Sequence, residues 1–224
     1  MTSAAFFDLD RTLLRKSSAL ALAGSFRQHG IISRTQAAKA AGWQLLFMLR
    51  GASHKAVRRA AEEGLIVLRG HTPEDIRALV ADAMETVLRP LVYAEPLQLL
   101  EQHRERGEQV FIVSATLQEI VDAIAEDLGF DGALGTVCEV VDGKYTGRAQ
   151  RALHAENKAD CVRELAARRD FDLNECTAYS DSHTDVPFLE VVGHPVAVNP
   201  DRKLRAIAAE RRWPVLEFRE RHAA

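Results

Sequence analysis

The 224-residue sequence has few cysteines and no excess of positive charge. Its three cysteines, Cys138, Cys161 and Cys176, are widely spaced and include no CxxC pair, which argues against a disulfide framework or a zinc site. There are 29 Lys and Arg against 32 Asp and Glu, a formal net charge of −3. A dedicated nucleic-acid binder normally shows a basic excess. We therefore expect buried, reduced thiols and no nucleic-acid partner.

Export and membrane signals are also missing. Asp8 and Asp10 interrupt the first apolar residues, unlike the basic and then apolar pattern of a signal peptide. The most apolar later stretch, residues 43–49, is far shorter than the roughly 20 residues that a membrane span needs. We expect a cytoplasmic protein without stable membrane insertion, and the sequence leaves its oligomeric state open.

The sequence does contain strand patterns that alternate with helix patterns. Strands are expected at residues 4–7, 109–113, 176–180, 195–198 and, at an edge, 214–218. Helices are expected up to residue 107 and at 117–128, 157–168, 186–191 and 202–211. Asp142-Gly143 predicts a two-residue hairpin turn within 136–147. This alternation predicts an α/β fold, a Rossmann-like, doubly wound, mostly parallel sheet with helices on both faces.

A helical segment interrupts this alternation directly after the first strand. Residues 17–89 show Ala-rich amphipathic patterns and no convincing strand. Within them, Thr72-Pro73-Glu74-Asp75 predicts a helix start, with Thr72 as the N-cap. We expect a catalytic core of residues 1–16 and 90–224 and an inserted, all-helical cap of residues 17–89.

Polar side chains follow three of the predicted strands. They lie in residues 8–12, 114–116 and 180–185, and Lys158 begins a helix between the second and third of these. Ligands of doubly wound sheets bind outside the carboxyl ends of the strands. Four acids, a hydroxyl and an ammonium group could therefore meet at one edge of the sheet.

That combination suits phosphoryl transfer. Clustered carboxylates repel one another unless a hard cation such as Mg²⁺ lies among them. One carboxylate could then attack phosphorus, and a second could act as general acid and base. Taken singly, the same residues have ordinary roles: the acids as turn or first-turn residues, Ser114 as a helix N-cap and Lys158 as a surface lysine.

Residues 6–13, Phe-Phe-Asp-Leu-Asp-Arg-Thr-Leu, resemble the DxDxT signature of the haloacid dehalogenase (HAD) superfamily of phosphatases. Ser114, Lys158 and residues 181–185 match the second, third and fourth signatures in the expected order. The resemblance covers essentially the whole chain. It is strongest to the phosphoserine phosphatase-like branch (subfamily IB), which carries a helical cap and a hairpin at the corresponding place.

The resemblance implies a role for each matching residue. Asp8 would be the nucleophile and Asp10 the general acid and base. Mg²⁺ would be bound by the Asp8 and Asp181 carboxylates and the backbone carbonyl of Asp10. Asp185 would support the metal site, through water or by orienting Lys158.

The remaining matches would serve the phosphate. Ser114 and Lys158 would bind it together with the backbone N–H of Ala115, and Thr12 would brace the nucleophile loop. The second acid, Asp10, speaks against dehalogenation, because dehalogenases of this superfamily lack it.

Three positions depart from phosphoserine phosphatases. Ser17 stands where those enzymes carry a glutamate that holds the substrate's amino group. Thr184 replaces a usual Asn of the fourth motif, and Ala115 replaces a Gly of the second. These changes keep the catalytic residues but put serine phosphate in doubt as the substrate.

Several residues have two readings each. We interpret His183 as a loop histidine rather than a proton shuttle, and Arg11 as exposed at the loop edge. A further basic group is either a solvated helix face or contacts an anionic substrate group: Arg50, Lys55, Arg58 and Arg59. Residues 43–49 are either cap core or an apolar wall for a lipid-like phosphate.

The favoured function is a magnesium-dependent phosphomonoester hydrolase acting on a small organic phosphate through an aspartyl-phosphate. Alternatives are phosphoserine phosphatase proper, a phosphatase of a lipid-like phosphate, and a phosphotransferase. A phospho-Asp signalling module would need neither Asp10 nor so large a helical insertion. A non-catalytic scaffold is disfavoured because every core catalytic residue is present.

Overall fold

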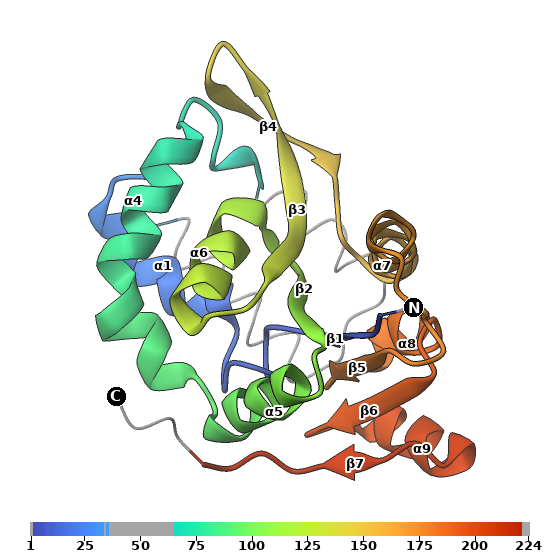
Figure 1. Ribbon diagram of the computed structural model, residues 1–224. Helices are drawn as coiled ribbons and strands as arrows, with labels where there is room; N and C mark the ends of the chain where they lie inside the picture. The colour runs from blue at the N-terminus through green and yellow to red at the C-terminus, as the bar shows by residue number, and fades with distance from the viewer. Residues whose placement is uncertain (1, 34, 36–64, 221–224) are drawn as a thin grey trace.

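The computed structural model describes residues 2–33, 35 and 65–220. It contains a seven-stranded sheet in the order β4-β3-β2-β1-β5-β6-β7 (Figure 1). The strands are β1 (Ala4–Phe7), β2 (Gln109–Leu117), β3 (Gly132–Val141), β4 (Lys144–Arg151), β5 (Thr177–Ser180), β6 (His194–Val198) and β7 (Val215–Leu216). All neighbours pair in parallel except β3 and β4, which form an antiparallel hairpin. The predicted α/β class with a mostly parallel sheet is confirmed.

Helices cover both faces of the sheet (Figure 1). One hydrophobic cluster joins the sheet to α1 (Ser18–Gln28), α4 (Pro73–Ala83), α5 (Ala94–Glu105) and α6 (Gln118–Leu128). A second cluster joins it to α7 (Glu156–Arg169), α8 (Val186–Leu189) and α9 (Arg202–Arg211). The central strand β1 contributes to both, because successive side chains of a strand point to opposite faces. Phe7 belongs to the first cluster and Phe6 to the second, and both are fully buried.

Strand β2 is longer than the sequence predicted. It continues past residue 113 to Leu117, and its pairing with β3 shifts register between Val113 and Leu117. The hydroxyl of Thr136 in β3 donates a hydrogen bond of 2.8 Å to the Ala115 carbonyl and helps to hold this extension. Helix α6 begins at Gln118 with Leu117 as its N-cap. The alternative of Ser114 as a helix N-cap was therefore wrong.

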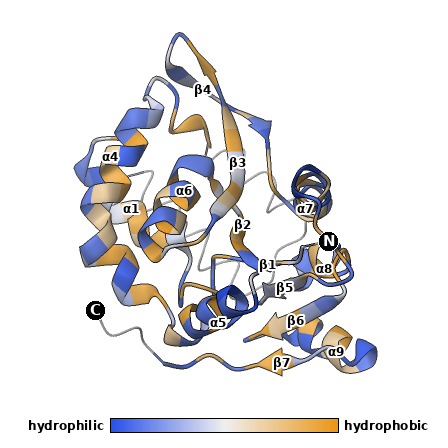
Figure 2. Cartoon of the chain, in the orientation of Figure 1, coloured by the Kyte–Doolittle hydropathy of each residue, from blue (hydrophilic) through white to orange (hydrophobic). Residues whose placement is uncertain are grey.

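The described elements between β1 and α5 are all helices or helical turns, joined by loops, in keeping with the helical patterns predicted for 17–89. After α1 and α4 come a π-helical turn (Met84–Leu88) and a 3₁₀ turn (Arg89–Leu91). Helix α4 buries Ile76, Leu79, Val80 and Ala83, the spacing of an amphipathic helix, and Figure 2 shows hydrophobic and hydrophilic residues side by side along it.

The predicted N-cap of α4 is confirmed. Thr72 accepts a hydrogen bond from the Asp75 amide at 3.1 Å, and the Asp75 carboxylate accepts one from the Thr72 amide at 2.7 Å. This reciprocal pair is a capping box. Residues 43–49 and Arg50, Lys55, Arg58 and Arg59 lie outside the described residues.

The β3–β4 hairpin is bonded to the segment that precedes α4. Asp142 and Gly143 form its turn with φ values of 50° and 74°, as a two-residue hairpin turn of this type requires. The Tyr145 amide donates to the His71 carbonyl at 2.9 Å, and the Gly70 amide donates to the Tyr145 carbonyl at 3.0 Å. Residues 70–71 thus add backbone hydrogen bonds to strand β4.

The cysteines are free and buried, as expected. Burial raises the pKa of all three thiols, which keeps them in the uncharged form. No helix among the described residues is both long and apolar enough to cross a membrane.

Candidate active site

The first acid of the predicted site lies at the carboxyl end of the central strand. Asp8 directly follows β1, and its amide donates a hydrogen bond of 2.9 Å to the Tyr179 carbonyl of β5. On the other side, Phe7 pairs with Ile112, which places Ser114 of β2 two residues further along, just past the end of β1. The β1, β2 and β5 edges therefore bring residues from 8, 114 and 181 onward to the same end of the sheet.

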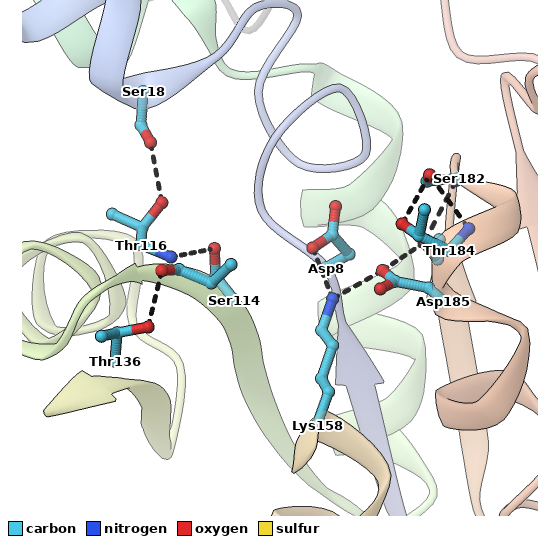
Figure 3. Close-up of polar contacts among 11 residues, drawn as sticks. Asp8, Ser18, Ser114, Thr116, Thr136, Lys158, Ser182, Thr184 and Asp185 are labelled. Atoms are coloured by element: carbon cyan, nitrogen blue, oxygen red, sulfur yellow. Dashed lines mark hydrogen bonds and ion pairs between the residues drawn. The ribbon is translucent and has the colours of Figure 1, made fainter. Parts of the chain in front are cut away.

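Lys158 joins two of these acids. It lies in the first turn of α7, and its Nζ is 2.7 Å from Asp8 Oδ1 and 2.6 Å from Asp185 Oδ2 (Figure 3). All three residues are buried. The Ser180 hydroxyl donates a further hydrogen bond of 2.7 Å to Asp185 Oδ2. The lysine is thereby fixed between the end of β1 and the loop after β5.

The carboxylates carry more negative charge than this lysine neutralises. Burial raises the pKa of Asp8 to about 7, with Lys158 opposing the rise and Asp185 adding to it. Burial and the nearby Asp8 raise the pKa of Asp181 to about 8. Burial alone would lower the pKa of Lys158, but Asp185 and Asp8 outweigh it and raise that pKa above its ordinary value.

This charge arrangement fits an oxygen-liganded cation. Within the described ranges, no three His, Cys, Asp or Glu side chains group as a metal site. The set expected from the sequence is smaller, two carboxylates and one backbone carbonyl. Asp8 is close enough to Asp181 to raise the pKa of that carboxyl, an effect that a hard divalent cation would reverse.

Asp10 is held by the first helix after β1. Its Oδ1 accepts a hydrogen bond of 2.8 Å from the Ser18 amide, at the N-terminus of α1. The Ser18 hydroxyl lies 3.0 Å from the Thr116 hydroxyl of β2 (Figure 3). Desolvation raises the pKa of Asp10 above its ordinary value, while the Ser18 hydrogen bond limits the rise.

The expected phosphate-binding residues have different surroundings. Ser114 is buried, and its oxygen accepts from the Thr116 amide at 3.1 Å, so its own hydrogen is still available to donate. Ala115 is exposed. Thr12 is fully buried, and its hydroxyl has no hydrogen-bond partner among the described residues. The loop is instead closed through the backbone, where the Leu13 and Leu14 amides donate to the Leu9 carbonyl at 3.0 and 2.8 Å.

The structure also shows the surroundings of His183 and Arg11, whose roles the sequence left open, and of two positions that depart from phosphoserine phosphatases. His183 Nδ1 lies 2.7 Å from the carboxylate of Asp201, the N-cap of α9. Arg11 is exposed, as expected for a loop edge. Thr184 lies 2.9 Å from the Ser182 hydroxyl. Ser17 is the N-cap residue of α1, whose first turn carries no acidic side chain.

Sequence reasoning gave no individual role to three residues that contact the site. Ser180 and Thr116 lie in the polar ranges 180–185 and 114–116, but the sequence did not indicate what they contact. Ser18 was missed, because its contact with Thr116 joins two segments 98 residues apart.

Comparison with known proteins agrees with this geometry. A family model described as haloacid dehalogenase-like hydrolase matches residues 5–190. A probable phosphatase of Mycobacterium tuberculosis is 43% identical over 96% of this chain and 75% of its own length. A protein named phosphoserine phosphatase from the same organism is 39% identical over 98% of this chain and 72% of its own. A crystal structure of a Bordetella pertussis protein of unknown function superposes with a TM-score of 0.83 at 30% identity, over 96% of this chain and 99% of that one.

Proposed function

The chain belongs to the haloacid dehalogenase-like hydrolase family, and from this we propose that it is a magnesium-dependent phosphomonoester hydrolase that acts through an aspartyl-phosphate on Asp8. The observation that carries the proposal is the buried Lys158 ammonium between Asp8 and Asp185, 2.7 and 2.6 Å from their oxygens. It holds the nucleophile in place at the carboxyl end of the central strand.

Mg²⁺ would be held by the Asp8 and Asp181 carboxylates and the Asp10 carbonyl, and when bound it would neutralise negative charge on the phosphate and on these carboxylates. Asp185 would act through Lys158, which it orients. Lys158 and the Ser114 hydroxyl would bind phosphate oxygens, with the exposed Ala115 amide beside them. Thr12, fully buried, would brace the nucleophile loop by packing, while the Leu13 and Leu14 amides close it through the Leu9 carbonyl.

The reaction divides into two displacements at phosphorus. In the first, an Asp8 oxygen forms a bond to phosphorus while the bond to the leaving oxygen breaks, and Asp10 donates a proton to that oxygen. In the second, water attacks phosphorus, its proton passes to Asp10, and the Asp8–phosphorus bond breaks to release phosphate. The raised pKa of Asp10 supports this role, because an acid must be protonated when the leaving group departs.

We further propose that residues 17–89 form a cap over a core of residues 1–16 and 90–224, and that the substrate is a small organic phosphate in the cytoplasm. A named phosphoserine phosphatase among the relatives keeps serine phosphate on the test panel. Against it, the first turn of α1 has no carboxylate to hold a substrate amino group.

The test is magnesium-dependent phosphate release from a panel of phosphomonoesters by the wild type and by Asp8→Asn. The panel contains p-nitrophenyl phosphate, phosphoserine, sugar and polyol phosphates, histidinol phosphate and lysophosphatidate. We expect turnover that needs Mg²⁺ and is lost in Asp8→Asn. A folded wild type that hydrolyses none of these esters would contradict the proposal.

A further inference from the structure

A polar cavity opens beside the proposed metal ligand Asp181. It has a volume of about 410 Å³, and the described residues that line it all lie outside the proposed cap of residues 17–89. Its lining residues are Arg11, Arg15, Tyr93, Asp181, Asn199, Asp201, Arg205, Glu217 and Phe218. Because Asp181 forms part of its wall, this cavity adjoins the site of phosphoryl transfer.

The charges of the wall are not all matched locally. Glu217 pairs with Arg205 at 2.6 Å. Asp201 pairs with His183 and accepts hydrogen bonds from the first amides of α9. Asp181 would be neutralised by the metal of the proposed function.

Two guanidinium groups remain. No ion pair or side-chain hydrogen bond of Arg11 or Arg15 occurs within the part of the chain that the structure describes. Arg11 is near enough to Asp181 to lower the pKa of that carboxyl against the effect of burial. Arg15 is half-buried, and its positive charge lowers the pKa of the neighbouring Tyr93 hydroxyl against the same effect.

The backbone fixes both arginines next to the nucleophile loop. Arg11 follows Asp10 with a φ of 65°, and the Arg15 amide donates to the Leu91 carbonyl at 2.8 Å. Tyr93 adds a hydroxyl, which the Asn199 side-chain amide contacts at 3.3 Å. The Asn199 side-chain oxygen accepts a hydrogen bond of 3.0 Å from the Phe218 amide, which fixes that side chain. Tyr93 and Asn199 therefore supply neutral polar groups to the cavity that the two arginines line.

We propose that this cavity is a subsite for a second anionic group of the substrate, a carboxylate or a phosphate, bound by Arg11 and Arg15. Guanidinium groups bind either anion through paired N–H donors. The inference rests on the proposed function and narrows its substrate class to phosphomonoesters that carry a further acidic group.

The experiment uses substrate pairs that differ only in that group. 2-Phosphoglycerate has a carboxylate where β-glycerophosphate has a hydroxymethyl group. Fructose 1,6-bisphosphate has a second phosphate that fructose 6-phosphate lacks. The kcat/KM ratio of acidic to neutral partner is measured for the wild type, Arg11→Gln and Arg15→Gln. Arg168→Gln, an exposed arginine ten residues after Lys158 on α7, is the control for loss of one positive charge.

We expect the wild type to favour the acidic partner of at least one pair, and the ratio to fall about 10-fold or more in each cavity variant but not in Arg168→Gln. The responding pair identifies the anion as carboxylate or phosphate. If the esters are hydrolysed but the ratios of wild type, cavity variants and control agree, the subsite is refuted while the proposed function stands. If even p-nitrophenyl phosphate is not hydrolysed, the proposed function itself fails.

Discussion

The Ser18 amide donates a hydrogen bond of 2.8 Å to the Asp10 carboxylate, which joins the proposed acid and base to the N-terminus of α1. The partial positive charge at a helix N-terminus favours a carboxylate there. The helix that follows the nucleophile loop therefore acts on the proton affinity of Asp10 as well as on its position.

Ser18→Pro should remove the amide hydrogen bond to Asp10 and still allow helix α1 to form. Proline lacks the amide hydrogen, is well tolerated at the first position of a helix, and needs an extended preceding residue, which Ser17 already is with φ −64° and ψ 127°. We expect kcat for an alkyl phosphate to fall about 10-fold, the size of one lost charge-assisted hydrogen bond. The pKa of Asp10 should rise, which moves the basic limb of the pH–kcat profile to higher pH.

Ser18→Ala is the matched control, because it keeps the amide and removes only the hydroxyl, which contacts Thr116 and also lowers the pKa of Asp10. Ser18→Pro removes both groups, so its basic limb should move further than that of Ser18→Ala, and the difference measures the amide. An equal loss of kcat in both variants would assign the effect to the hydroxyl instead of the amide.

Lys158→Met should damage both stability and activity. The substitution keeps a long side chain but leaves the buried Asp8 and Asp185 without their shared cation. Removing one partner of a buried ion pair costs about 3–5 kcal/mol of unfolding free energy. Urea unfolding without Mg²⁺ should show this loss, and phosphate release should be abolished. A variant as stable as the wild type would show that the two carboxylates do not depend on the lysine.

Stability without metal should depend on pH in a defined direction. The pKa values of Asp8 and Asp181, about 7 and about 8, lie above their ordinary value of 3.8. Between pH of about 4 and about 8, the folded state still binds protons on these carboxyls that the unfolded state has lost. The free energy of unfolding therefore falls as pH rises through this window. Bound Mg²⁺ would favour the ionised carboxylates and offset this fall.

The measurement is the gain in Tm on adding Mg²⁺, at pH 5 and at pH 8. We expect the larger gain at pH 8 and a much smaller gain in Asp181→Asn at both values. A gain independent of pH, or unaffected by Asp181→Asn, would place the cation elsewhere.

The hairpin should depend on a close contact with residues 65–69. Gly147 has a φ of 81°, and a Cβ there would lie 3.2 Å from Ile66 Cα and 3.4 Å from the Leu65 carbonyl oxygen. Gly143 has a similar φ of 74°, but a Cβ there would meet nothing within 4 Å. Both alanine substitutions therefore incur the left-handed strain, and only Gly147→Ala adds the overlap.

We expect Gly147→Ala to lose about 1 kcal/mol or more of unfolding free energy beyond the loss in Gly143→Ala, measured by urea unfolding. Equal losses would mean that residues 65–69 move aside without cost.

Local patterns in the sequence were sufficient for most of the fold. A short apolar run that ends in acids identifies β1, and Thr72-Pro73 marks the start of α4, because these signals depend on residues only a few positions apart. The motifs at Asp8, Asp10, Ser114, Lys158 and 181–185 likewise predicted which segments meet, since parallel strands bring their carboxyl ends to one edge.

Contacts between distant segments were decided only by the tertiary structure. The length of β2 depends on its pairing with β3 and on Thr136, which lies 21 residues beyond Ala115. The hydrogen bond from α1 to Asp10 and the cavity lined by Arg15 and Asn199 depend on how the loops pack and on which way their side chains point. Sequence periodicity places a residue on an element, but it carries no information about which distant side chain that residue will face.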